Sequence, residues 1–153
     1  MQLNQALGSF PVKLDEKNRI ILPARARATL ADQTYLAQGL GECIFVFSTE
    51  QFAKFCAHLR EQTLPGIDPM DFDRLFFASV VNQVPDKQGR VTIPLMHRQY
   101  AQLGRELMII GLEDRFEIWD AARWGNYQTQ HLEAFSKAQV GLRSSINRPT
   151  TTQ

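Results

Sequence analysis

The sequence predicts an α+β protein made of two tandem β-hairpin/helix modules that share one core. The main observation is a repeated pattern, Asp-x-x-x-Arg followed by alternating apolar residues and Pro, at residues 15–23 and again at residues 86–94. The match continues downstream with one inserted residue, so that Gly39-Leu40 align with Gly111-Leu112. A register held over about 40 residues indicates an internal repeat. Because each repeat of about 45 residues is too small to bury a secure core, the two halves, or several chains, must share one.

The first module is expected at residues 9–55, after a loose arm over residues 1–9. Apolar residues alternate on both sides of its Asp-x-x-x-Arg turn, as they do in half-buried strands, and Asn18 is a residue type that tolerates a positive φ. Further along, Ser48 and Gln51 form a capping box. The expected elements are strands 10–14 and 20–22, which pair as a hairpin, a helix at 23–30, strands 35–38 and 43–47, and a helix after Ser48.

The second module is expected at residues 80–127, after a helical linker at residues 56–79. Residues 128–153 are expected to contain the end of the last helix and, from Gly141 onward, a disordered tail rich in Ser, Thr, Asn, Arg and Pro. The expected elements are a helix that begins at Asp68 and carries Phe72, Leu75 and Phe76 on one face, a strand at 79–84 leading into the second hairpin, a helix after Pro94, strands 107–110 and 116–119, and a last helix capped by Asp120.

Charge and composition narrow the class of protein. The net charge is only +1, but positive charge is concentrated in the repeated motifs, with five basic residues against two acidic ones over residues 12–27. No signal peptide and no membrane-spanning segment are visible. Cys43 and Cys56 show no pairing pattern, so we expect reduced thiols in a cytoplasmic protein.

The sequence does not favour an enzyme. His58, His97 and His131 are scattered without metal-ligand spacing, and no phosphate loop or nucleophile motif is present, so we expect no metal, cofactor or small-molecule substrate. A group of three aspartates could bind a divalent cation, but a role in capping a helix and complementing its dipole explains their position better. This group is Asp68, Asp71 and Asp73. Five aromatic side chains could stack on bases, but their spacing favours the core. They are Phe72, Phe76, Phe77, Trp119 and Trp124.

Arg19 and Arg90 are the candidate functional side chains. Each could form a structural ion pair with the Asp of its own motif, Asp15 or Asp86, but an exposed pair of this kind contributes only about 0–1 kcal/mol. Stability alone is therefore a weak reason for the arrangement to occur twice. The functional alternative is a guanidinium on a stiff turn that contacts guanine edges or phosphate. Neighbouring cations would contact phosphates. These cations are Lys13, Lys17, Lys87 and Arg25.

Three stretches make the chain similar to a known family. They are Leu14-Asp15-Glu16-Lys17-Asn18-Arg19 with Leu22-Pro23-Ala24, then Phe72-Asp73-Arg74-Leu75-Phe76-Phe77 running into Asp86-Lys87-Gln88-Gly89-Arg90, and then Gly111-Leu112-Glu113-Asp114-Arg115-Phe116-Glu117-Ile118-Trp119. On these residues the chain resembles the MraZ family, which is built from two SpoVT-AbrB-type swapped-hairpin modules. The resemblance implies that the shared core is a double-split β-barrel.

The same resemblance implies a function. MraZ proteins are DNA-binding transcriptional regulators of the bacterial division and cell-wall gene cluster, including their own promoter. They form ring-shaped homo-oligomers, octamers or dodecamers, and associate with the nucleoid. Double-stranded DNA is therefore the expected partner, bound at direct repeats in the upstream region. The residues implied to contact it are Asp15, Lys17 and Arg19, and their equivalents Asp86, Lys87 and Arg90. The alternative is an antitoxin-like or protein-binding oligomer that uses the same hairpins, which the neutral overall charge favours.

Overall fold

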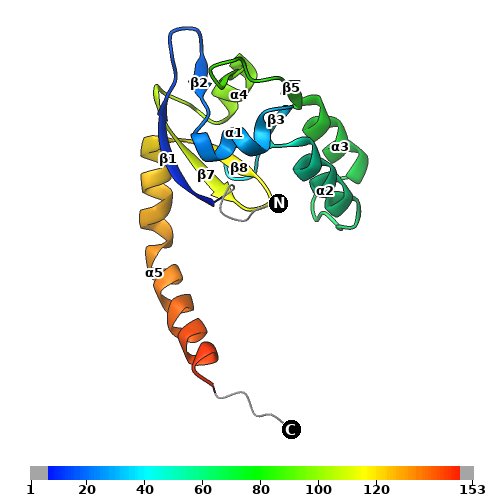
Figure 1. The fold of residues 1–153 in the computed structure, drawn as a ribbon. Coiled ribbons are helices and arrows are strands. Elements are labelled where there is room, and N and C mark those ends of the chain that lie inside the picture. The colour runs from blue at the N-terminus through cyan, green and yellow to red at the C-terminus, as the bar shows by residue number, and fades with distance from the viewer. Residues whose placement is uncertain (1–6, 149–153) are drawn as a thin grey trace. The chain divides into compact units, whose positions relative to one another are not determined.

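The computed structural model describes residues 7–148, which form an antiparallel sheet of six strands, a two-stranded ribbon and five helices (Figure 1). The chain divides into two compact units after Ala121. Residues 1–6 of the expected arm lie outside the described residues. For residues 7–9 that expectation is wrong, because they belong to the first strand and pair with residues 110–112.

The sheet combines strands from both repeats. Its spatial order is β1-β7-β8-β4-β3-β5, and the ribbon pairs β2 with β6. The strands are β1 (Leu7–Lys13), β2 (Arg19–Ile21), β3 (Thr34–Gln38), β4 (Ile44–Phe47), β5 (Val81–Gln83), β6 (Arg90–Thr92), β7 (Glu106–Leu112) and β8 (Phe116–Asp120). Each strand of the sheet has a counterpart in the other repeat: β1 corresponds to β5, β3 to β7 and β4 to β8. Replacing every strand by its counterpart gives the same order read from the opposite edge of the sheet. The two repeats are therefore related by a pseudo-two-fold axis.

The two strands of each expected hairpin do not pair with each other. β1 pairs with β7, and β2 pairs with β6, so the prediction that residues 10–14 and 20–22 form a ladder is wrong. The turn between them is closed by a backbone hydrogen bond, which the Asp15 N–H donates to the Arg19 carbonyl at 2.8 Å. Alternating apolar residues predict a strand but do not indicate which other strand pairs with it. The module limits at 9–55 and 80–127 therefore describe the repeat in sequence, whereas the sheet interleaves the two modules.

Four helices accompany the sheet and the ribbon within the first unit. They are α1 (Ala24–Leu30), α2 (Thr49–Arg60), α3 (Pro69–Ala78) and α4 (Leu95–Tyr100). Ser48 and Gln51 form the predicted capping box of α2, and Asp68 caps α3 by accepting from the Met70 N–H at 2.8 Å. None of the helices in residues 7–148 has the length and apolar character needed to cross a bilayer.

The hydrophobic core draws on both repeats, as expected. The ribbon contributes Ile20 and Val91, each 1% exposed. Burying side chains of this size stabilises the fold by about 1.5–3 kcal/mol each. Other large members of the core cluster come from the sheet, the helices and the segments that flank the ribbon strands: Leu14, Leu22, Leu30, Leu36, Ile44, Ile93, Leu107, Ile109, Phe116 and Ile118.

The aromatic residues of α2 and α3 hold these two helices together. The ring centroids of Phe55 and Phe76 lie 5.5 Å apart, and Phe72 stacks on Phe76 at 5.9 Å. The core assignment is confirmed for Phe76 and Trp119, which are buried, and is wrong for Phe77, which is exposed. Leu75, expected on the same inner face, is also exposed, because it lies off the side of α3 that meets α2.

The last helix, α5 (Ala121–Ile146), is longer than expected. The predicted disorder from Gly141 is wrong up to Ile146, and residues 149–153 lie outside the described residues. A helical Gly costs only about 1 kcal/mol, and here the helix continues through both Gly125 and Gly141. The Ser144 hydroxyl donates to the Val140 carbonyl at 3.2 Å, so this Ser is satisfied within the helix.

His97 on α4 is a buried polar side chain inside this core. It is fully buried, and neither ring nitrogen makes a hydrogen bond of good geometry within the described residues. Burial lowers the pKa of His97, and the backbone of Ser79 and Leu36 opposes this shift in part. The neutral imidazole is therefore the form that the fold stabilises.

We expect separate fragments of residues 1–66 and 67–153 to fold poorly. The cut removes β7 from β1 and removes β5 from β3, which leaves unpaired strands and half a core. Circular dichroism and sedimentation of each fragment test this expectation. Two fragments that are each monomeric and unfold cooperatively would contradict the shared core.

We also expect the free energy of unfolding to fall as the pH drops from about 6.5 to 5. The unfolded chain binds a proton at His97 near pH 6.5, whereas the folded chain, with a lowered pKa, does not. Urea unfolding across this pH range should show a slope that His97→Leu reduces. An unaltered slope in His97→Leu would exclude His97 as its source.

Candidate nucleic-acid interface

The first candidate site is the turn between β1 and β2, where one carboxylate organises the backbone. Oδ1 of Asp15 accepts from the backbone N–H groups of Lys17 at 2.8 Å and Arg19 at 2.9 Å. Oδ2 accepts from Nε of Arg19 at 2.9 Å. Asn18 adopts a φ of 60°, as the sequence predicted for this tight turn. The carboxylate thus fixes the turn and the arginine together.

The second turn repeats this geometry atom for atom. Oδ1 of Asp86 accepts from the N–H groups of Gln88 and Arg90, both at 2.9 Å, and Oδ2 accepts from Nε of Arg90 at 2.7 Å. Gly89 takes the place of Asn18, with a φ of 76°. Because both copies keep the arrangement, it is a property of the repeated motif.

Hydrogen bonds keep both carboxylates ionised. The pKa of Asp15 is lowered, first by the bond from the Arg19 backbone N–H, and the pKa of Asp86 is lowered first by the bond from the Arg90 backbone N–H. Each guanidinium uses Nε for its ion pair, and its side chain stays 26% exposed at Arg19 and 29% exposed at Arg90. The described residues form no further bond to the terminal nitrogens of these two arginines.

The two arginines lie on one face of the β2–β6 ribbon. Arg19 stands opposite Thr92, and Arg90 stands opposite Ile21. Diagonal neighbours of this kind lie about 7–8 Å apart at their Cα atoms. Successive strand residues alternate in direction, so the buried pair between them faces the core and the arginines face outward. The ribbon therefore presents both arginines on its outer face.

Arg27 is a residue that the site prediction missed. Its Nε donates to the Leu22 carbonyl at 2.9 Å, and its side chain lies on Gly89 of the other repeat. A Cβ at Gly89 would come within 2.6 Å of that Nε. Arg98 repeats the bond, donating from Nε to the Ile93 carbonyl at 3.0 Å. The available signal was the alignment of Arg27 with Arg98 in the repeat.

The other predicted cations lie on or near the two turns. Lys17 is exposed on the turn, and Lys13 ends β1, where it stands opposite Glu106. Lys87 is exposed on the second turn. Arg25 is exposed on α1, with its guanidinium 6.0 Å from the centre of the Phe10 ring. Seven of the eight predicted residues thus lie on the two turns or within two residues of them in sequence, and Arg25 lies on α1.

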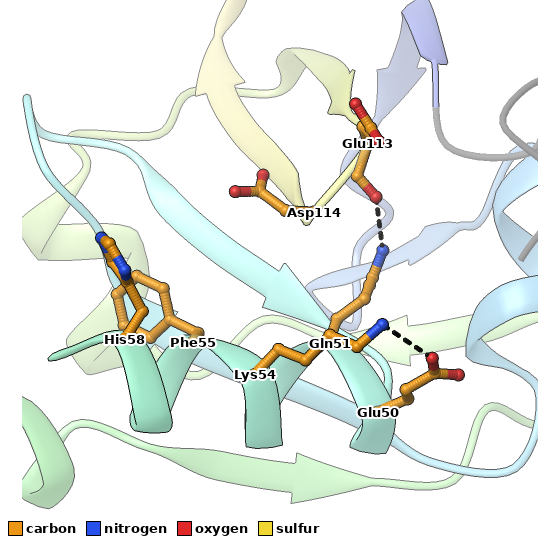
Figure 2. Close-up of a pocket in the computed structure, with 7 residues that line it drawn as sticks. All are labelled: Glu50, Gln51, Lys54, Phe55, His58, Glu113 and Asp114. Carbon is orange, nitrogen blue, oxygen red and sulfur yellow. Dashed lines mark hydrogen bonds and ion pairs between the residues drawn. The ribbon is translucent and has the colours of Figure 1, made fainter. Parts of the chain in front are cut away.

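A separate pocket lies between α2 and the β7–β8 turn (Figure 2). It has a volume of about 330 Å³, and Gln51 closes one side by donating to the Glu113 carbonyl at 3.1 Å. Glu50, bonded to Lys54 at 3.0 Å, lies at its edge. Three of its seven lining residues are acidic, Glu50, Glu113 and Asp114, and none of the seven is a predicted site residue. No cluster of His, Cys, Asp and Glu within residues 7–148 could hold a metal ion.

We expect Gly89→Ala to destabilise the protein more than Gly66→Ala does. Both glycines have positive φ, which costs another residue about 1–2 kcal/mol, but a Cβ at Gly66 meets nothing within 4 Å. The difference therefore measures the displacement of Arg27. Chemical unfolding of both variants tests this expectation, and the difference should disappear when both glycine substitutions are made in an Arg27→Ala background. Equal losses of stability in the two glycine variants would show that the position of Arg27 does not require a residue without a side chain at position 89.

Comparisons with known proteins agree with the internal repeat. The family model described as "MraZ protein, putative antitoxin-like" matches residues 6–74 and 76–142. A protein of Kocuria rhizophila named "Transcriptional regulator MraZ" is 44% identical over 133 residues, which is 87% of this chain and 93% of that protein. One of Paenarthrobacter aurescens with the same name is 47% identical over 131 residues, or 86% and 92%. The chain belongs to the MraZ family.

Proposed function

We propose that this protein is a transcriptional regulator that binds double-stranded DNA sequence-specifically through the outer face of the β2–β6 ribbon. The observation that carries the proposal is the pair of Asp-oriented arginines, Arg19 and Arg90, on that face. Relatives named "Transcriptional regulator MraZ" support the same function.

The shape and charge of the ribbon suit the major groove of DNA. That groove admits a two-stranded β-ribbon, and an arginine there contacts O6 and N7 of guanine. Each Asp holds its arginine through Nε, which leaves the terminal nitrogens for a base edge. Lys13, Lys17 and Lys87 supply charge for phosphates, together with Arg25. Asp15 and Asp86 contribute by orienting Arg19 and Arg90.

The finer form of the proposal follows the family resemblance. The core would be a double-split β-barrel, and several copies would close into a ring, an octamer or a dodecamer. A ring presents the same ribbon repeatedly, so its target would be direct repeats about 10 bp apart on one face of the duplex. The repeats would lie in its own upstream region, in the division and cell-wall gene cluster. The protein would then be cytoplasmic and associated with the nucleoid.

An antitoxin-like, protein-binding role is the second candidate. The description of the matching family model favours it, and so does the net charge of +1. Its partner would contact the same turns without reading a sequence. A DNA titration separates the two candidates, because only the first predicts a preference for repeats over a scrambled duplex.

We expect Arg19→Ala to abolish the preference for a repeat-bearing duplex, with a loss of about 1–3 kcal/mol per site. Lys17→Ala, two residues away in the same turn, should instead weaken all duplexes alike and flatten the salt dependence. Arg90→Ala should act as Arg19→Ala does, but less strongly. Gel-shift titrations on repeat-bearing and scrambled duplexes, each at two salt concentrations, provide the measurement.

Sedimentation of each variant must accompany these titrations, since a lost assembly would also weaken binding. If Arg19→Ala keeps the wild-type assembly and still prefers the repeats, Arg19 is a structural partner of Asp15. The proposed reading of DNA by the ribbon would then be wrong.

A further inference from the structure

The outer face of the β2–β6 ribbon carries two side chains besides the arginines. Ile21 is 53% exposed there, and Thr92, its equivalent in the second repeat, is exposed as well. Both are β-branched, so each holds a methyl group on a side chain with restricted rotation. A single exposed isoleucine is ordinary on a protein surface, but this one lies on the face to which the arginines point. A ligand of that face would therefore also contact Ile21.

Each arginine has one of these side chains directly opposite it. Ile21 pairs with Arg90, and Thr92 pairs with Arg19. Side chains that stand directly opposite in an antiparallel ribbon have Cβ atoms about 4.5–5.5 Å apart, whereas successive nucleotides of a DNA strand lie about 3.4 Å apart. A guanidinium on one base therefore places the side chain opposite it over a neighbouring base.

The side chain of Gln83 occupies the ribbon edge beside Thr92. Its Nε2 donates to the Thr92 carbonyl and its Oε1 accepts from the Thr92 N–H, each at 2.8 Å. At this residue the bonds take up the backbone groups through which an added strand would pair with β6. The outward side chains, rather than this edge, are thus what the ribbon offers to a ligand here.

We propose that Ile21 is a further specificity-determining residue, which contacts the 5-methyl group of a thymine next to the guanine that Arg90 contacts. Thr92 holds the equivalent place beside Arg19. Among the four bases of DNA, thymine alone presents a methyl group in the major groove, and apolar side chains and the threonine methyl contact it. The ribbon then reads a guanine and an adjacent thymine together. This inference rests on the proposed function and assigns a second base to the same face.

Deoxyuridine provides the test, because it differs from thymidine only by lacking the 5-methyl group. The probes are a duplex of the protein's own upstream region and the same duplex with deoxyuridine in place of every thymidine. We expect the full-length wild type to bind the second probe at least about fourfold more weakly, the factor that corresponds to one buried methyl group. Ile21→Ala should reduce this ratio of dissociation constants about fourfold.

Two further variants control for the fold and for apolar surface in general. Ile21→Thr places the residue of the second repeat in the first and keeps a β-branched side chain in the strand, so it should reduce the ratio less than Ile21→Ala does. Leu40→Ala is the matched control, because Leu40 is 71% exposed but lies in the β3–β4 turn. It should keep the wild-type ratio.

Single replacements in the duplex locate the contact. Each thymidine is replaced in turn by deoxyuridine, and each guanosine by 7-deazaguanosine, which lacks the N7 acceptor. We expect the thymines whose replacement affects the wild type but not Ile21→Ala to adjoin the guanines whose replacement affects the wild type but not Arg90→Ala. Thymines that lie apart from those guanines would overturn the assignment of Ile21 and Arg90 to neighbouring bases.

The same titrations distinguish this inference from the proposed function. Equal affinities of the wild type for the two probes, or an unchanged ratio in Ile21→Ala, would overturn the thymine contact while leaving DNA binding by the ribbon intact. A wild type that binds neither probe would reject the proposed function, and the thymine contact with it.

Discussion

The pairing of Ile20 with Val91 is the contact on which the rest of the structure depends. These two residues are equivalent positions of the repeat, they stand opposite each other in the β2–β6 ribbon, and both are almost completely buried. Two further backbone bonds extend the ribbon, from Leu22 N–H to the Gly89 carbonyl and from Ile93 N–H to the Asn18 carbonyl, each 2.8 Å long. Because each repeat completes the other's ribbon, the two turns are fixed relative to each other.

Within each turn, the carboxylate contributes orientation more than stability. A solvent-exposed ion pair such as Asp15–Arg19 contributes little to stability, and the backbone bonds to the same carboxylate mainly satisfy donors that the turn leaves unpaired. The arginine, however, loses most of its rotational freedom before any ligand arrives. A side chain ordered in advance loses less entropy on binding. Arg27 extends this order across the axis by lying on Gly89.

Local features were predictable from the sequence, because the residues that determine them lie within about four positions of each other. The capping box at Ser48, the Asp68 cap and the positive φ at Asn18 are examples that the structure bears out. Strand partners were not predictable, since alternation along β1 is compatible with pairing to β2 or to β7. The contact of Arg27 with Gly89 depends on that long-range choice and was missed with it.

The differences between the repeats explain why they pair with each other. On the axis between β4 and β8, Phe45 stands opposite Glu117. The Arg115 guanidinium bonds Glu117 at 3.0 Å and lies 4.5 Å from the centre of the Phe45 ring. A symmetric pair of second repeats would place two buried carboxylates face to face, which is costly. A symmetric pair of first repeats would lack the guanidinium over the ring. Pairing within one chain is therefore favoured over pairing between identical halves.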